Sequence, residues 1–214
     1  MRAVAVAAAL LLSGCATTPS GREIVEDSAK ALAAAPVCCD TLAKATRSAL
    51  PTKPTEIVLD RSAQAFDFGG NKAFFLLYEL PVFQQPYSVV ITSVAGGHMT
   101  DVALLIPRIT VFDADFKPTR YFDEKTLRNR GNNLERTVFI NPSNQGERYL
   151  AIYGSDLSAS IERAYSMVTV TPVVAGPIVF NMYGGQDGKS TLRSSPTGKL
   201  KLEAQGLAPP IAAR

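Results

Sequence analysis

Tryptophan is absent from the chain, and histidine occurs only once among its 214 residues. The first absence removes the largest aromatic platform for a sugar ring, and the second excludes a metal site built from several histidines. Charge is also sparse, because Asp, Glu, Lys and Arg make up 19% of the residues and the net charge is +3. This balance argues against a nucleic-acid partner, since a phosphate backbone is bound by a strongly basic surface.

Cysteine is scarce too, and the first of its three residues ends the opening stretch MRAVAVAAALLLSGC. Arg2 precedes an apolar run, Ala3 to Leu12, that is too short to cross a membrane. The small residues before Cys15 resemble the bacterial lipobox, whose cysteine is acylated and becomes the mature N-terminus. We therefore expect a signal peptide over residues 1–14 and lipidation at Cys15, with acyl chains that anchor the protein to a membrane. By the same resemblance, Ala16 in place of Asp favours the outer membrane.

The other two cysteines, Cys38 and Cys39, are neighbours in the stretch PVCCD. Three interpretations compete: buried free thiols, a vicinal disulfide that stiffens the turn, and an intermolecular or redox role. Adjacent Cα atoms lie about 3.8 Å apart, below the usual disulfide span of about 4.4–6.8 Å. The pair is not a Cys-x-x-Cys motif and has no second pair to complete a zinc site, so we predict neither redox turnover nor metal.

Between the lipid and the folded domain the sequence predicts one short helix. Ser20 and Glu23 have the spacing of a capping box, apolar residues follow at helical intervals, and Pro36 stops the pattern. We expect a tether over 15–20, then a helix over about 21–35 within a helix-and-linker segment that reaches residue 54. Because five residues extend at most roughly 18 Å, the domain would sit close to the membrane.

From Glu56 onward, short apolar or alternating runs are separated by Gly, Pro, Asn and Asp. This texture predicts a mainly β domain over 55–204, a two-sheet sandwich of the jelly-roll or immunoglobulin-like kind. A βαβ fold would need helices between the strands. The expected strands are 56–60, 64–68, 72–80, 87–94, 102–112, 137–140, 148–153, 167–174, 178–183 and 199–204.

The connections carry further expectations. Residues 156–165 are a candidate short helix, and the polar, small-residue segment 186–197 is a candidate mobile loop. In the last strand, lysines alternate with leucines, which predicts one buried face and an edge position guarded by Lys199 and Lys201. Residues 205–214 are expected to form a disordered tail.

Catalytic patterns are weak. His98 has Asp101 nearby in sequence and Ser93 on the preceding strand, but this spacing is common and no Gly-x-Ser-x-Gly elbow occurs. Asp113 and Asp115 lack the glycine and closing glutamate of a calcium loop. The better interpretation is that Asp113 accepts backbone N–H groups and fixes a turn while Phe116 folds onto the core. No pair of carboxylates stands out as glycosidase machinery, and we expect no enzyme activity, cofactor or metal.

Sugar binding remains an alternative, because aromatic rings at strand ends and clustered amides can contact a glycan. The same aromatic rings can instead cap a hydrophobic core, and the same amides can lie in solvated turns. The candidate aromatic residues are Tyr78, Phe83, Tyr87, Tyr121, Phe122, Tyr153 and Tyr183. The candidate amides are Asn132, Asn133, Asn141, Asn144 and Gln145.

Four segments together resemble the maltose operon periplasmic protein (MalM) family. They are Phe66-Asp67-Phe68 through NKAFFLLYELP, then PRITVFDADFKPTRYF, ERYLAIYGSDL and GKLKLEA, in the family's order across most of 55–204. The lipobox and the Cys-Cys pair set this chain apart as a lipid-anchored branch.

The resemblance implies a periplasmic protein connected with maltodextrin uptake through the outer membrane. Together with the lipobox, it leads us to expect an accessory lipoprotein held at the inner leaflet of the outer membrane. It would act through contacts with an outer-membrane porin or another transport component, or through weak glycan binding. The alternative is a structural envelope lipoprotein with no sugar role. The family carries no catalytic motif to transfer to this chain.

Overall fold

The computed structural model describes residues 19–98, 101–131, 133–154, 157–158 and 160–207. The predicted helix is confirmed as α1, Gly21–Ala34, and so is its capping box. The backbone N–H of Glu23 donates to Ser20 Oγ (3.3 Å), and the N–H of Ser20 donates to the Glu23 carboxylate (2.7 Å). These bonds satisfy donors that a helix N-terminus leaves open, so a short local pattern fixed where α1 begins.

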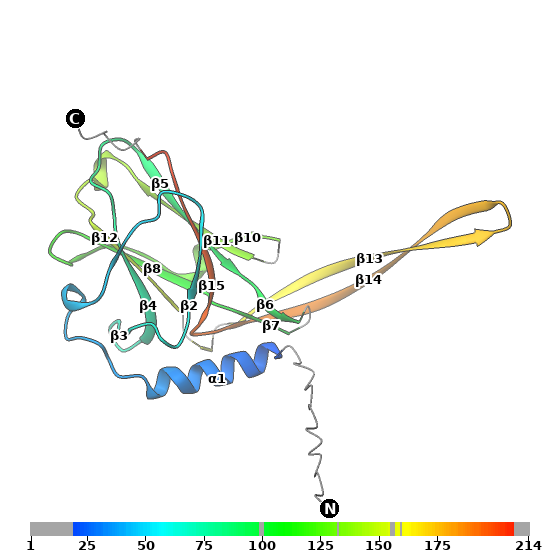
Figure 1. Ribbon diagram of the computed structural model, residues 1–214, viewed down its shortest axis with the longest axis horizontal. Coiled ribbons are helices and arrows are strands. Elements are labelled where there is room, and N and C mark those ends of the chain that lie inside the picture. Colours follow the sequence, from blue (N-terminus) through cyan, green and yellow to red (C-terminus); the bar gives the residue numbers. More distant parts are fainter. Residues whose placement is uncertain (1–18, 99–100, 132, 155–156, 159, 208–214) are drawn as a thin grey trace, which may run out of the picture.

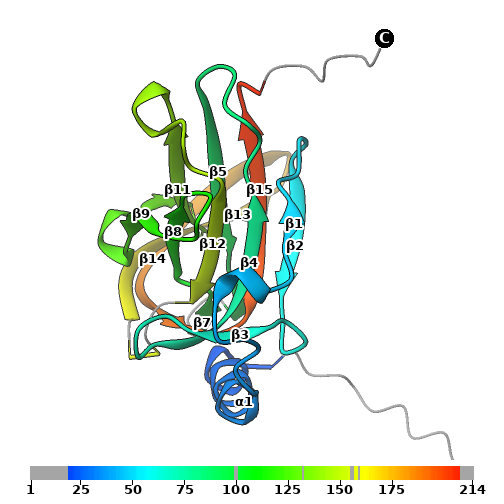
Figure 2. The same cartoon turned by 90° about the vertical axis from the view of Figure 1, so that its left-hand side faces the viewer.

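Two sheets form the predicted β-sandwich (Figures 1 and 2). The first has the order β1 (Ser48–Ala49), β4 (Lys72–Glu79), β12 (Tyr149–Gly154), β8 (Pro107–Phe112) and β9 (Pro118–Phe122), with β3 (Ala65–Asp67) also paired to β4. The second has the order β10 (Arg128–Arg130), β11 (Asn133–Ile140), β5 (Tyr87–Val94), β15 (Gly198–Gln205) and β2 (Thr55–Leu59). All these pairings are antiparallel except β1 with β4.

The core lies between the sheets because inward and outward residues alternate along the strands. Leu150 and Ile152 of β12 face Val89 and Ile91 of β5 across an apolar layer, and Leu32 packs there from α1. The outward residues of the first sheet pack instead under residues 39–45 and form a smaller aromatic cluster. Its members include Phe66, Phe68, Phe75, Phe116, Tyr149 and Tyr153. The first sheet is therefore covered on both faces.

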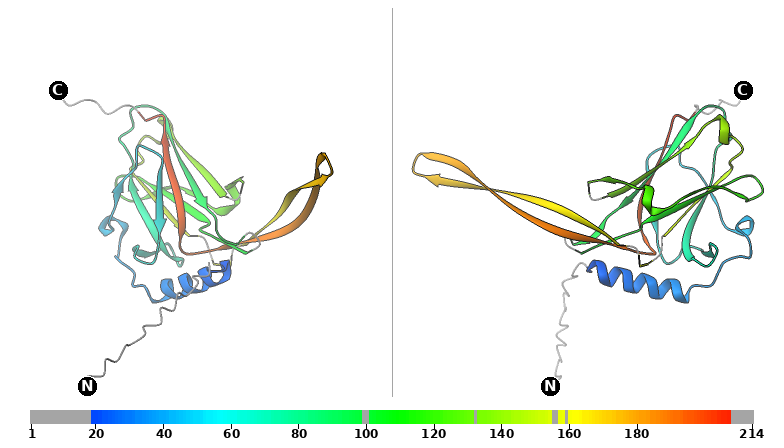
Figure 3. Two further views of the ribbon diagram at one scale, coloured as in Figure 1. Left: turned by 45° about the vertical axis from the view of Figure 1, so that its right-hand side comes forward. Right: turned by 180° about the vertical axis from the view of Figure 1, so that it is seen from behind.

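A third sheet holds the feature that the sequence did not predict. Its order is β13 (Ser160–Ala175), β14 (Ile178–Ser194), β7 (Asp101–Leu104) and β6 (Gly96–His98). β13 and β14 are paired along their whole length and project from the sandwich as a two-stranded ribbon, here called the arm (Figures 1 and 3). Residues Thr191–Ser194 of β14 lie parallel to β7 and join the arm to the domain.

Four expectations about local structure are wrong. The candidate helix is not a helix: its residues 160–165 belong to β13, and Asp156 lies outside the described residues. The candidate loop is mostly strand, because its residues 186–194 belong to β14. Residues 186–194 are mostly polar or small, with serine at the buried positions 190 and 194, so this part of β14 resembles a loop in composition although it is paired in a sheet. The strand expected over 102–112 is two strands, β7 and β8, in different sheets. β15 is not an edge strand, because it lies between β5 and β2. The alternation of lysine and leucine shows that one face of the strand is exposed to solvent, but it does not show where the strand lies in the sheet.

Candidate functional site

One end of the sandwich carries a shallow hollow of about 460 Å³. Tyr87 begins β5 and pairs with Ile140 at the end of β11, while Gln205 at the end of β15 pairs with Ser88. Antiparallel pairing thus brings three strand ends together, at the end of the sandwich opposite α1 (Figure 2). We call this hollow the groove; it is lined by Pro86, Tyr87, Ser88, Phe139, Ile140, Asn141, Gln205 and Gly206.

The groove presents an aromatic ring to solvent. Phe139 is 61% exposed, whereas its neighbours Val138 and Ile140 are 0% and 1% exposed. Strand alternation sends those two side chains into the core and leaves Phe139 on the opposite face. Two other hollows, of about 430 and 260 Å³, are lined by residues that include no aromatic side chain. The groove is therefore the better candidate for a ligand that stacks on a ring.

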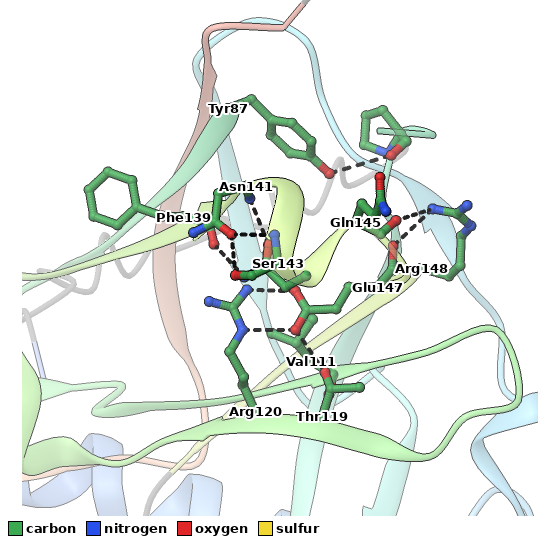
Figure 4. Close-up of polar contacts among 12 residues, drawn as sticks. Tyr87, Val111, Thr119, Arg120, Phe139, Asn141, Ser143, Gln145, Glu147 and Arg148 are labelled. Atoms are coloured by element: carbon green, nitrogen blue, oxygen red, sulfur yellow. Dashed lines mark hydrogen bonds and ion pairs between the residues drawn. The ribbon is translucent and has the colours of Figure 1, made fainter. Parts of the chain in front are cut away.

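The turn after Phe139 is held by its own amides (Figure 4). Asn141 Oδ1 accepts from the backbone N–H and the hydroxyl of Ser143 (3.0 and 2.6 Å), and Asn144 Oδ1 accepts from the N–H of Asn141 (2.6 Å). These contacts cap a 3₁₀ helix, η3 (Pro142–Asn144). Asn144 Nδ2 also donates to the carbonyl of Phe139 (3.3 Å). The ring consequently stands on a turn whose backbone is already fixed.

A buried ion pair supports this turn (Figure 4). Glu147 is 3% exposed, and its carboxylate accepts from Arg120 Nε and Nη2 (2.8 and 2.5 Å) and from the Thr119 hydroxyl (2.8 Å). The backbone N–H of Glu147 donates to the carbonyl of Asn144 (3.1 Å) and so ties the pair to η3. A carboxylate held by three donors is fixed in place and serves as support for the groove.

Ser93, His98 and Asp101, which formed only a weak catalytic pattern in the sequence, lie on three strands, and His98 and Asp101 are register partners of β6 and β7. Ser93 is fully buried and its hydroxyl donates to the carbonyl of Leu105 (2.5 Å), so it faces the core. His98 belongs to β6 and Asp101 to β7, but their side chains lie outside the described part.

The turn interpretation of Asp113 is confirmed. Its Oδ1 accepts from the backbone N–H groups of Asp115 and Lys117 (2.9 Å each). Phe116 stacks on Tyr149 with ring centroids 4.1 Å apart and packs on the outer aromatic cluster. Within the described ranges, no group of three potential metal ligands comes together.

The candidate aromatic residues divide between core and surface. Tyr78, Tyr87 and Tyr153 are buried, and burial raises the pKa of Tyr78 and of Tyr87 to about 12. Phe83 and Phe122 are half-buried against the core. Tyr121 and Tyr183 are 55% and 73% exposed, on β9 and on the arm.

Sequence reasoning missed Phe139. The signal was available, because Phe139 occupies the outward position of an alternating strand between Val138 and Ile140. Among the candidate amides, Asn141 lines the groove, and Asn144 and Gln145 lie in or directly after η3. Asn133 begins β11 and lies at the far end of that strand, and Asn132 is outside the described residues.

The structure joins Cys38 and Cys39 as a vicinal disulfide. Cys38 is exposed and its backbone N–H donates to the carbonyl of Ala65 (2.8 Å), whereas Cys39 is half-buried on the outer aromatic cluster. The pair thus lies where the chain passes from α1 onto the first sheet. The expected signal peptide, the predicted lipidation site Cys15 and most of the expected tail, 208–214, lie outside the described residues.

Comparison of the chain with protein-family models, with curated proteins and with solved structures finds no match. No helix within the described residues is both long and apolar enough to cross a bilayer. The resemblance to the MalM family and the lipid anchor at Cys15 therefore stay predictions.

Proposed function

We propose that this chain is a lipid-anchored periplasmic accessory protein of carbohydrate uptake, which binds a glycan such as maltodextrin weakly in the groove. The observation that carries the proposal is the exposed ring of Phe139, mounted on a rigid turn in a hollow at the loop end of the sandwich. The lipobox pattern before Cys15 and the resemblance to the MalM family supply the envelope location and the link to maltodextrin.

The groove offers both kinds of contact that a sugar requires. The apolar face of a pyranose ring packs on the Phe139 ring, while its hydroxyl groups meet the amides of Asn141 and Gln205. The Oδ1 atom of Asn141 already accepts two hydrogen bonds from Ser143. No atom in the described part of the chain accepts a hydrogen bond from the Nδ2 atom of Asn141. That amide group is available to donate to a ligand.

The arrangement is suited to weak binding. A single exposed ring in an open hollow covers one face of a sugar, and a dissociation constant of about 1 mM corresponds to a binding free energy of about −4 kcal/mol. With Cys15 in the inner leaflet and α1 at the nearer end of the domain, the groove would face away from the membrane. A glycan that leaves a porin would meet it from the periplasmic side.

Titration of the purified protein with maltooligosaccharides, followed by NMR, tests the sugar claim. The expected result is saturable shifts of the Phe139 and Asn141 resonances and a loss of affinity of about 2- to 13-fold in Phe139→Ala, as a stacking contribution of about 0.5–1.5 kcal/mol implies. Tyr121→Ala is the matched control, because Tyr121 is an aromatic residue of similar exposure outside the groove. Absence of saturable shifts, or equal losses in the two variants, would refute glycan binding here.

Lipidation is tested separately. Mass spectrometry of the protein from membranes should find an acylated Cys15 as the first residue, and Cys15→Ser should move the protein out of the outer-membrane fraction. An acylated protein without glycan binding would leave the alternative, a structural envelope lipoprotein. An unmodified, soluble N-terminus would remove the anchor and the envelope location together.

A further inference from the structure

The arm exposes many apolar side chains to solvent. Nine of its apolar side chains are between 43% and 73% exposed: Met167, Val168, Val170, Val174, Ile178, Val179, Phe180, Met182 and Tyr183. Residues 164–186 contain no Asp, Glu, Lys or Arg. An isolated two-stranded hairpin is marginally stable at best, and an apolar patch of this kind marks an interaction surface.

Among the described residues of the arm, those at its root are the ones that contact the domain. Arg163 donates to the carbonyl of Gly131 and to Asn129 Oδ1 (2.6 Å), and β14 pairs with β7 through residues 191–194. Beyond this root, the arm extends away from the sandwich (Figure 3). Within the described residues, no strand other than β13 pairs with the stretch 178–190 of β14. That stretch therefore presents a row of unpaired backbone N–H and C=O groups.

We propose that the arm is a dimerisation element, and that its occupant is the arm of a second copy of this chain. The two β14 edges would pair antiparallel about a two-fold axis near Met182, which sets Ile178 opposite Gln186 of the second copy. β14 is the better edge because β13 contains Pro172, which has no N–H to donate, whereas residues 178–190 contain no proline. The inference does not depend on glycan binding or on the lipid anchor.

The residues along the β14 edge agree with a second copy. Five of the nine exposed apolar residues belong to β14 and would flank the seam between the two paired edges: Ile178, Val179, Phe180, Met182 and Tyr183. In a pairing centred at Met182, residues 178–186 of one β14 strand lie beside the same residues of the other, and these residues carry no charge. The charged residues near the root, such as Glu162, Arg163, Asp187 and Lys189, stay outside the overlap, and the two domains lie at opposite ends of the paired arms.

A bilayer fits the arm less well. Hydrocarbon provides no partners for the N–H and C=O groups along an open strand edge, and each unsatisfied group in lipid is costly. A second copy satisfies the N–H and C=O groups along the β14 edge and brings apolar side chains of the two β14 strands side by side. We therefore favour a protein contact over insertion into lipid.

Site-specific crosslinking tests the proposal. The full-length protein with Cys15→Ser and Met182→Cys is treated with a short bismaleimide, and the expected result is a covalent dimer on a denaturing gel. The Cys15→Ser change, also made in the control, removes the remaining cysteine, so the result does not depend on lipidation. Val58→Cys is the matched control, because Val58 is similarly exposed (57% against 58% for Met182) but lies on β2 of the sandwich. Cys38 and Cys39 are disulfide-bonded and do not react with maleimide. The control should remain monomeric.

Val179→Asp in the Met182→Cys background places a carboxylate in the expected interface and should abolish the dimer. An unchanged unfolding temperature of this variant shows that the sandwich remains folded, since Val179 contributes nothing to its core. Equal crosslinking at positions 58 and 182, or survival of the dimer in Val179→Asp, would overturn the proposal. So would a thiol in the Met182→Cys variant that reacts with a monofunctional maleimide yet gives no dimer. Quenching of a fluorophore on that thiol by lipid-phase quenchers, without crosslinking, would assign the arm to the bilayer instead.

Discussion

Removal of Arg120 should destabilise the protein more than any loss of a surface ion pair. The side chain of Glu147 is 2% exposed, and Arg120 supplies two of the three donors to its carboxylate. In Arg120→Ala the carboxylate stays buried with Thr119 alone. Breaking one side of a buried pair costs about 3–5 kcal/mol, which is a large part of the roughly 5–15 kcal/mol that stabilises a typical domain.

The chain contains a matched control for this prediction. Arg61 and Asp27 form an equally short pair (2.6 Å), but their side chains are 67% and 62% exposed. Arg61→Ala should lower the free energy of unfolding by less than about 1 kcal/mol, because water replaces the lost partner. Urea unfolding of both variants measures the difference. Equal losses would refute the reasoning, since burial of Glu147 would then add nothing to the cost.

Two further predictions concern the sandwich itself. Gly198→Ala would place a Cβ atom 2.8 Å from Leu105 Cβ, and urea unfolding should show a loss of about 1–3 kcal/mol, typical of overpacking; an unchanged midpoint would contradict the contact. The protein should also lose stability as the pH rises from about 10 to about 12. Burial raises the pKa of Tyr78 and Tyr87 from 10.0 to about 12 in the folded state, so in this window the unfolded state releases protons first and is favoured. Unfolding free energies at about pH 9 and about pH 11 would check the sign, and a flat profile would show that neither phenol is protected.

Elements with a strong local signal were predicted well. The capping box and Pro36 bracket the expected helix 21–35, against Gly21–Ala34 in the structure, and the strand expected over 87–94 is β5 with the same bounds. The turn at Asp113 follows from a side chain that bonds its own backbone. In each case the residues that determine the structure are neighbours in sequence.

The candidate site was predictable only in part. The amides of Asn141 and Asn144 were noted, but the exposed ring of Phe139 was not, and the aromatic residues Tyr78, Tyr87 and Tyr153 proved to be buried. Exposure of a ring depends on which face of its strand is covered and on which loops meet beside it. Glu147 and Arg120, which support the groove, gave no sequence signal because 27 positions separate them.

The sequence by itself determined that this chain would form a helix followed by a β-sandwich, because alternation, caps and turns act within a few residues. Only the tertiary structure decided which strands became neighbours: it placed β15 inside the second sheet and split residues 102–112 between two sheets. It also placed residues 186–194, expected as part of a loop, in the part of β14 that joins the arm to the domain. Strand pairing satisfies backbone groups, which every residue except proline carries in full, so the side-chain pattern shows that a strand exists but not which strand lies beside it.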